Sequence, residues 1–259
     1  YRSARRLAEL DDQLGGRLTR MREWMDEGMF GGWRDVHPTG LDQAEEDEPF
    51  FMFAAASPGF FLFTPFFEGS EEIAWINRFP EERRRPLIQG YRDFLQRHLY
   101  VHPGKTLLAK NVMLAGRMGI VREAVPSARF VHLVRHPYEV IPSALSMLTA
   151  PWKFHSPDIP TDGPQMRRLA DITMAYYKEL AQQCDASDPD HFLELRYTDL
   201  VEDPDQAVQR IYTHFDLDWN VPLARRIRAA TRKQAGHRSK HQYSLAQFGL
   251  DRAQVYEAM

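Results

Sequence analysis

Cysteine is nearly absent from this sequence, and its scarcity bears on both the fold and the compartment. Cys184 is the only cysteine among the 259 residues, so the chain cannot form an internal disulfide. Structural disulfides persist in oxidising compartments, whereas reducing compartments keep thiols free. No secretory signal opens the sequence either. We therefore expect a cytoplasmic protein.

A long uninterrupted apolar run is also lacking, although one stretch comes close. Residues 50–67, the phenylalanine-rich segment, hold half of the 16 phenylalanines of the chain. Pro58, Gly59 and Pro65 interrupt this segment, and its length is marginal for a bilayer crossing. We expect no clear membrane span, and instead a buried segment that walls an apolar pocket.

Neither sign of charge prevails in the composition. The 33 basic and 36 acidic residues leave a formal net charge of −3. Such a chain has no general attraction to nucleic acid, so we expect no nucleic-acid partner and only a local basic site. With 43% hydrophobic residues, the chain is long enough to bury a full core, and we expect one domain over residues 1–259.

Two familiar ligand motifs remain incomplete. Residues 104–106 read Gly-Lys-Thr, like the end of the phosphate-binding loop G-x-x-x-x-G-K-[ST], but Leu99 stands where that loop needs its first glycine. A nucleotide kinase built on this loop therefore remains only an alternative. His98 and His102 have the spacing of two metal ligands, yet no third ligand accompanies them. We expect no metal.

Helical periodicity covers much of the remaining sequence. Apolar residues at spacings of three and four over residues 4–29 predict one amphipathic helix, or two helices broken at Gly15-Gly16. A stiff loop that serves as a lid, or a plain surface excursion, is expected over 151–164, which holds four prolines. Further helices are expected from Pro86 to about Tyr100, from Leu114 to Val125, over 165–183, after an Asp203-Pro204 cap, and over 221–235.

The most informative stretch is FVHLVRHPYEVIPSALSM, residues 130–147. Its first five residues predict one buried strand, and a helical segment follows Arg135 and a His-Pro break. Parallel α/β proteins place ligands at the carboxyl ends of strands. Arg135 offers there a planar fork of donors that suits a phosphate, and Ser143 adds a hydroxyl. The alternative interpretation makes Arg135 a surface arginine and Ser143 an ordinary helix residue.

Two further apolar runs, over 106–109 and 192–196, predict additional strands of a parallel sheet. The helix between the 106–109 run and residue 130 makes a strand–helix–strand unit, in which both strands run the same way. Lys110 follows the first of these strands as Arg135 follows the second. We therefore expect Lys110 and Arg135 to converge on one anion, which favours the phosphate interpretation.

Several motifs, in this order along the chain, resemble the sulfotransferases that use 3′-phosphoadenosine 5′-phosphosulfate, and among them the bacterial-type branch with an E-D-E stretch. The recurring motifs are an L-x-K-[SN] stretch, an R-[HD]-P turn after a strand, an R-Y-x-D-L stretch and an R-S-x-H-x-Y-S-L…F-G-L ending. The resemblance covers most of the chain. The matching residues are 46–48, 108–111, 125–137, 196–200, 238–245 and 248–250.

This resemblance implies a fold and a reaction. The fold is a helix-rich, three-layer α/β/α architecture with a central parallel sheet, related to the P-loop nucleotide hydrolases. The reaction moves a sulfuryl group from the donor to a hydroxyl of an unknown, apolar or aromatic, small-molecule alcohol or phenol. The alternative is a non-catalytic remnant of this fold that binds adenosine phosphates or a partner. The phenylalanine-rich segment favours an apolar acceptor over a charged glycan.

The resemblance also assigns roles to individual residues. Arg135 and Ser143 keep the family's spacing of eight and would hold the 3′-phosphate, with Arg238 or Lys240 as further contacts. Lys110 would lie near the bridging oxygen and stabilise the leaving phosphate. The family's R-Y-x-D-L tyrosine contacts adenine, and the resemblance implies this role for Tyr197.

Two departures from the family pattern matter. Many members carry a histidine shortly after the lysine, whereas this chain continues from Asn111 with Val-Met-Leu. The catalytic base is therefore assigned to Glu46 first and Glu48 second, because they enter the phenylalanine-rich segment, with His136 as a weaker candidate. The 5′-phosphosulfate loop, P-x-x-G-T-T, is not found in the sequence. We expect this loop and the first strand upstream of Tyr1, and residues 1–259 alone to be inactive.

Overall fold

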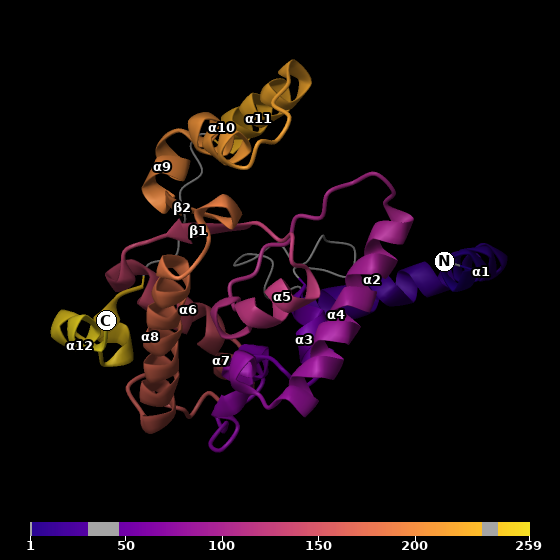
Figure 1. The fold of residues 1–259 in the computed structure, drawn as a ribbon. Coiled ribbons are helices and arrows are strands. Elements are labelled where there is room, and N and C mark those ends of the chain that lie inside the picture. Colours follow the sequence, from indigo (N-terminus) through magenta and orange to yellow (C-terminus); the bar gives the residue numbers. More distant parts are fainter. Residues whose placement is uncertain (1, 31–46, 235–242) are drawn as a thin grey trace. The chain divides into compact units, whose positions relative to one another are not determined.

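The structure is a computed structural model that describes residues 2–30, 47–234 and 243–259 (Figure 1). The chain divides into two compact units. The N-terminal unit comprises Tyr1–Pro49 and Asp93–Asn111, and the main unit comprises Phe50–Arg92 and Val112–Met259. The single domain expected over residues 1–259 stays a prediction.

The N-terminal unit contains two successive helices, α1 (Arg2–Gln13) and α2 (Arg17–Phe30). Gly15 and Gly16 separate them with φ angles of +63° and +77°, which glycine adopts without steric cost. Asp11 accepts a hydrogen bond of 2.7 Å from the backbone N–H of Leu18 and so caps the start of α2. The two-helix alternative predicted from the sequence is confirmed.

The long helix α4 (Glu81–Val101) begins earlier than the sequence predicts. Pro86 was expected to start it, but Pro86 lies inside the helix. The carbonyl of Pro80 accepts the first backbone hydrogen bonds, and two acidic residues occupy the first turn, where they favour the positive end of the helix dipole. The rule that places proline in the first turn therefore gave the wrong start here.

A parallel pair of strands lies at the centre of the main unit. Strand β1 (Phe130–Val134) pairs with β2 (Phe192–Arg196) residue for residue, from Phe130↔Phe192 to Val134↔Arg196. Figure 1 shows the two strands side by side, with helix α9 continuing directly from β2. Both strands have the bounds that the apolar runs predict. The helix-rich α/β class with a parallel sheet is confirmed.

Residues 106–109 do not form the strand that the sequence predicts. Among the described residues, the sheet consists of β1 and β2 alone. The side chain of Leu108 is 94% exposed, so this apolar run buries little surface and has no sheet to join. A strand needs a neighbour that takes its backbone hydrogen bonds. Lys110 therefore follows an irregular segment and not a strand.

Two helices contribute buried residues to the main hydrophobic cluster: α6 (Pro137–Thr149), which follows β1, and α8 (Pro164–Asp185). Leu145 of α6 and Leu169 of α8 are completely buried in one hydrophobic cluster. Trp152 also belongs to this cluster, and its indole N–H donates to the carbonyl of Phe61 at 2.7 Å. The proline-rich stretch 151–164, expected as a loop, thus includes the short helix α7 (Trp152–His155).

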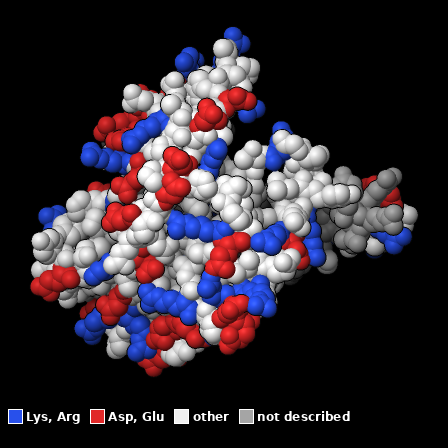
Figure 2. All heavy atoms as spheres, viewed as in Figure 1, with Lys and Arg blue, Asp and Glu red and all other residues white. Residues whose placement is uncertain are grey.

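The remaining elements follow the predicted order. Asp203 accepts from the backbone N–H of Gln206 at 3.0 Å, which confirms the predicted cap. Basic and acidic side chains are interspersed on the face drawn in Figure 2, and no helix within the described ranges is long and apolar enough to cross a membrane. The other α-helices are α3 (Glu48–Phe53), α5 (Met118–Ala124), α9 (Tyr197–Glu202), α10 (Pro204–His214), α11 (Val221–Gln234) and α12 (Arg252–Ala258). Short 3-10 helices are η2 (Pro58–Leu62), η3 (Glu71–Ala74), η4 (Ile76–Arg78), η5 (Ala115–Arg117), η6 (Pro189–His191) and η7 (Leu245–Phe248).

Candidate functional site

The register of the sheet brings two predicted site residues to the same edge. Val134 and Arg196 are paired as the last residues of β1 and β2, so Arg135 and Tyr197 follow them side by side. The guanidinium carbon of Arg135 lies 5.1 Å from the centre of the Tyr197 ring, within the range of a cation–π contact. The carboxyl ends of parallel strands are where α/β proteins bind ligands. The structure therefore joins two of the residues predicted for the donor.

Arg135 is held by contacts from three directions. Its Nε donates to Glu139 Oε2 at 3.0 Å, and its Nη1 lies 3.5 Å from the hydroxyl of Tyr243. The hydroxyl of Tyr177 donates to the backbone carbonyl of Arg135. The side chain of Arg135 remains 29% exposed, so its donors are fixed in direction yet open to an anion in solvent.

The same contacts tune the charge of this arginine. Burial by itself lowers the pKa of the Arg135 guanidinium, but the hydrogen bonds to Glu139 and Tyr243 outweigh it, and the pKa lies above its ordinary value. The guanidinium is therefore charged at any pH at which the protein folds. A fixed, permanently charged fork at a strand end suits a phosphate.

Three residues around Arg135 were not predicted from the sequence as site residues. Tyr243 belongs to the R-S-x-H-x-Y ending, so the motif itself held the signal. Glu139 stands four residues after Arg135, a spacing at which opposite charges meet on a helix. Tyr177 lies on α8, far from Arg135 in the sequence, and no local sequence pattern predicts their contact.

Ser143 lies in the middle of α6, and His136 precedes the first residue of this helix. Ser143 is partly buried within the helix, and its contribution to an anion site with Arg135 stays a prediction. His136 caps α6, because its Nδ1 accepts from the backbone N–H of Tyr138 at 3.2 Å. A histidine that caps a helix has a structural reason to be there. Its role as a base stays a prediction.

In the N-terminal unit, the acidic stretch meets the lysine segment. The side-chain amide of Asn111 donates to Asp47 Oδ1, and Asp47 is only 8% exposed. Glu48 begins α3 directly after Asp47, whereas Lys110 precedes Asn111 and is exposed. This contact of Asp47 with the residue after Lys110 was not predicted from the sequence, although Asp47 is the middle residue of the E-D-E stretch.

Several predicted site residues are not joined by the structure. Glu46, Arg238 and Lys240 lie outside the described residues. Lys110 belongs to the N-terminal unit and Arg135 to the main unit. The convergence of these two cations on one anion therefore stays a prediction.

The phenylalanine-rich segment is buried only in part. Phe51, Phe61 and Phe67 are almost fully buried, and the rings of Phe61 and Phe67 stack with 4.3 Å between their centres. By contrast, Phe53 is 94% exposed and Phe63 and Phe66 are 62% and 68% exposed. Full burial of the segment was therefore a wrong expectation. That the segment lines an acceptor pocket stays a prediction.

Matches to known proteins extend over most of these elements. The sequence profile of the Sulfotransferase family matches residues 6–221. The omega-hydroxy-beta-dihydromenaquinone-9 sulfotransferase Stf3 of Mycobacterium bovis is 33% identical over 119 residues. Stf3 of Mycobacterium tuberculosis matches to the same extent. Each alignment covers 46% of this chain and 31% of the relative, so the matched part is about a third of the length of these curated relatives.

Two solved structures resemble the fold. The crystal structure of sulfotransferase STF1 from Mycobacterium tuberculosis superposes with a TM-score of 0.64 at 19% identity, over 91% of this chain and 61% of that one. Sulfotransferase STF9 from Mycobacterium avium gives a TM-score of 0.62 at 17% identity, over 76% of this chain and 49% of that one. At such identities the likeness concerns the fold alone, and it confirms the sulfotransferase fold that the motifs imply.

Proposed function

We propose that this chain, which belongs to the sulfotransferase family, transfers a sulfuryl group from 3′-phosphoadenosine 5′-phosphosulfate to a hydroxyl of an apolar acceptor. The observation that carries the proposal is the pair of Arg135 and Tyr197 at the carboxyl edge of the sheet. The donor presents a phosphate and an adenine near one another. A guanidinium fork suits the first and an aromatic ring the second.

Arg135, Ser143, Lys110 and Tyr197 have different roles in the proposed transfer. Sulfuryl transfer resembles phosphoryl transfer, an in-line displacement in which charge spreads over non-bridging and leaving oxygens. The protein mainly positions the donor and stabilises that charge. Arg135 and Ser143 anchor the 3′-phosphate, and Lys110 stabilises the leaving phosphate. Tyr197 packs near the adenine.

A base must also take the proton of the acceptor hydroxyl. Glu46 is our first candidate and Glu48 our second. The hydrogen bond between the buried Asp47 and Asn111 supports this choice, since it holds the residue that precedes Glu48 next to the segment that carries Lys110. A carboxylate held near the leaving-group lysine is well placed to act as a general base.

The acceptor is proposed to be lipophilic. The exposed rings of Phe53, Phe63 and Phe66 offer apolar surface that a polar substrate would leave unused. The name of the related Stf3 records a hydroxylated menaquinone derivative. A long-chain or aromatic alcohol is therefore the acceptor class that we propose for this chain.

Calorimetry with adenosine 3′,5′-bisphosphate tests the donor site. We expect Arg135→Ala to weaken binding by about 1.5–3 kcal/mol, the range for hydrogen bonds to charged groups. Arg78→Ala is the matched control, because Arg78 also bonds a carboxylate, Glu179, at 2.9 Å and also covers a ring, Trp75, at 4.6 Å. Unchanged affinity in Arg135→Ala, or an equal loss in Arg78→Ala, contradicts the assignment.

Transfer assays then separate the alternatives. The full-length protein is incubated with the labelled sulfate donor and a panel of long-chain alcohols and phenols, and ATP is tested in parallel as a phosphate donor. Transfer of sulfate to an apolar member supports the proposal. Binding of the bisphosphate without any transfer favours a non-catalytic remnant, and phosphate transfer from ATP favours the kinase.

A further inference from the structure

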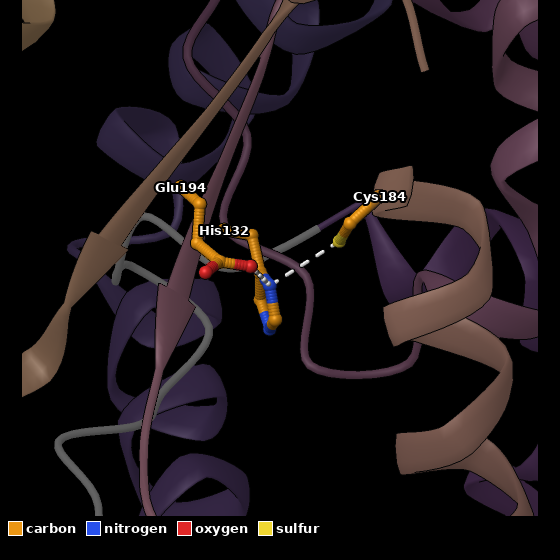
Figure 3. Close-up of side chains that lie close together, drawn as sticks. All are labelled: His132, Cys184 and Glu194. Carbon is orange, nitrogen blue, oxygen red and sulfur yellow. Dashed lines mark hydrogen bonds and ion pairs between the residues drawn. The ribbon is translucent and has the colours of Figure 1, made fainter. Parts of the chain in front are cut away.

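On the strands that lead to the candidate donor site, three potential ligand side chains face one another. His132 lies on β1 and Glu194 on β2, where the two residues are paired directly across the ladder. Cys184 comes from the last turn of α8. Figure 3 shows the thiol and the carboxylate approaching the imidazole from opposite sides. Among the described residues, this group of three brings its ligand atoms within 4.8 Å of one another.

The distances are close to those of a tetrahedral metal site. His132 Nδ1 lies 3.3 Å from Cys184 Sγ and 3.5 Å from Glu194 Oε2. With zinc–ligand bonds of about 2.0–2.3 Å, two ligands of a tetrahedral zinc ion lie roughly 3.3–3.6 Å apart. Two of the three separations therefore need no rearrangement. The third, between the sulfur and the carboxylate, is closed by rotation of the Glu194 side chain, which is 58% exposed.

Two carboxylates, those of Glu194 and Asp185, and one cation, Arg122, act on the thiol of Cys184. Burial, together with the carboxylates of Glu194 and Asp185, raises the pKa of the Cys184 thiol to about 11. Burial lowers the pKa of the His132 imidazole, and the neighbouring carboxylate of Glu194 opposes this shift. Imidazole, thiolate and carboxylate groups are all ligands of Zn²⁺, so the donor set fits the geometry of the site.

We propose that His132, Cys184 and Glu194 bind one thiophilic divalent cation, Zn²⁺ before others, with a water molecule as fourth ligand. On binding, the bond from Zn²⁺ to Sγ replaces the S–H bond, and the thiol proton is released to solvent. Thiolate and imidazole ligands select Zn²⁺ over Mg²⁺ and Ca²⁺, which require oxygen ligands. The exposed side of Glu194 leaves the fourth position open to water.

Such an ion would tie three elements together. It would join the end of α8 to both strands of the sheet, and the residues that follow these strands are Arg135 and Tyr197. The site is independent of the proposed sulfuryl transfer, because none of its three ligands is assigned a role in that reaction. No local spacing signals it, since Cys184 and His132 are 52 positions apart in the sequence.

Cobalt is the probe that tests the site, because a thiolate bound to Co²⁺ gives a charge-transfer absorption in the near ultraviolet. Cys184 is the only cysteine, so this absorption reports on one known atom. We expect the band to saturate at one Co²⁺ per chain, to disappear when Zn²⁺ is added, and to be unaffected by Mg²⁺ or Ca²⁺. Absence of a band overturns the proposal.

Variants separate a built site from a simple thiol adduct. We expect Cys184→Ser to abolish the band, and His132→Gln and Glu194→Gln each to weaken Co²⁺ binding by more than about 100-fold, the upper range for outer-shell partners. Asp185→Asn is the matched control, because it removes a neighbouring carboxylate that is not a ligand, and we expect it to bind normally. A band that persists at full affinity in both His132→Gln and Glu194→Gln overturns the proposal.

A thermal measurement guards against misfolded variants. Zn²⁺ should raise the Tm of the unmodified protein and of Asp185→Asn, by an amount that grows with the logarithm of its concentration above the Kd, since it binds only the folded chain. Glu194 is exposed, so Glu194→Gln is expected to keep the metal-free Tm and lose the response to Zn²⁺. An equal response in Glu194→Gln contradicts the site.

Discussion

Two apolar runs, each followed by a cation, have very different structures. The run over 130–134 forms β1, is paired along its whole length with β2, and delivers Arg135 to the edge of the sheet. The run over 106–109 forms no strand, and Leu108 is almost fully exposed. Local sequence is similar in both cases, and the difference is the partner: a strand is stable where a neighbour accepts its hydrogen bonds and covers its side chains.

The comparison has a functional side. Arg135 is fixed by the sheet, by Glu139 and by Tyr243, as suits a residue that binds the unchanging part of a donor. Lys110 lies on irregular backbone of the N-terminal unit, and Glu48 lies at the first residue of α3. Loops carried by a rigid scaffold commonly provide reacting groups. We therefore expect variants of the irregular segments to affect turnover and variants of the strand ends to affect donor binding.

The largest effect is expected from the base. Glu46→Gln should lower turnover by about 10²-fold or more, since general base catalysis contributes about 10²–10⁴-fold, while bisphosphate affinity stays nearly constant. Glu48→Gln is the matched variant two residues away. Loss of turnover in Glu48→Gln alone moves the role to Glu48. If both variants remain active, the base lies elsewhere, and His155 in the proline-rich stretch is the next residue to test.

Removal of the lysine should come next. Lys110→Ala is expected to lower kcat by about 10²–10³, the cost of losing one donor to the charge of a transition state. Lys105→Ala, an exposed lysine of the same segment, serves as control and should leave kcat unchanged. Equal kcat in Lys110→Ala and the unmodified enzyme would remove the lysine from the reaction.

Stability offers a direct test of the difference between the two runs. Leu195 of β2 is 1% exposed, so Leu195→Ala should reduce the free energy of unfolding by about 2–5 kcal/mol. Leu108→Ala should change it by less than about 0.5 kcal/mol, as at other exposed positions. Both values come from denaturant unfolding. A loss of several kcal/mol in Leu108→Ala would show that this run is buried and paired after all.

How far the sequence predicts the structure depends on how local the information is. Both strands, the break at Gly15-Gly16 and the Asp203 cap follow from patterns within a few residues, and all are confirmed. The predicted start of α4 was wrong, because the acidic residues before Pro86 already form the first turn of the helix. The prediction of a strand over 106–109 was wrong, because strand pairing depends on residues far along the chain.

The candidate site shows the same division. Arg135 was predicted because it stands directly after an apolar run, and Tyr197 because the family resemblance implies contact with adenine. The register of the sheet then joins them. The contacts from Tyr177 and from the Asp47–Asn111 pair were not predicted, because each links segments that only the fold brings together. The trio of His132, Cys184 and Glu194 was missed for the same reason.

The smallest effect is expected at the ring beside Arg135. Tyr197→Ala should weaken bisphosphate binding by about 0.5–2 kcal/mol, the range for a cation–π contact that is partly exposed. Tyr197→Phe keeps the ring and should bind nearly as the unmodified protein does. A loss in Tyr197→Phe as large as in Tyr197→Ala would assign the effect to the hydroxyl and not to the ring.

A double variant then decides whether the ring acts through the guanidinium or through the adenine. If Tyr197 mainly orients Arg135, its removal costs little once Arg135 is already alanine, and the two losses in binding energy are not additive. If the ring packs on adenine by itself, the losses add, because stacking on a base does not need the arginine. Additive losses, measured by calorimetry on Arg135→Ala, Tyr197→Ala and the double variant, would break the link between the two strand ends. Non-additive losses would show that the sheet register serves to place one side chain on the other.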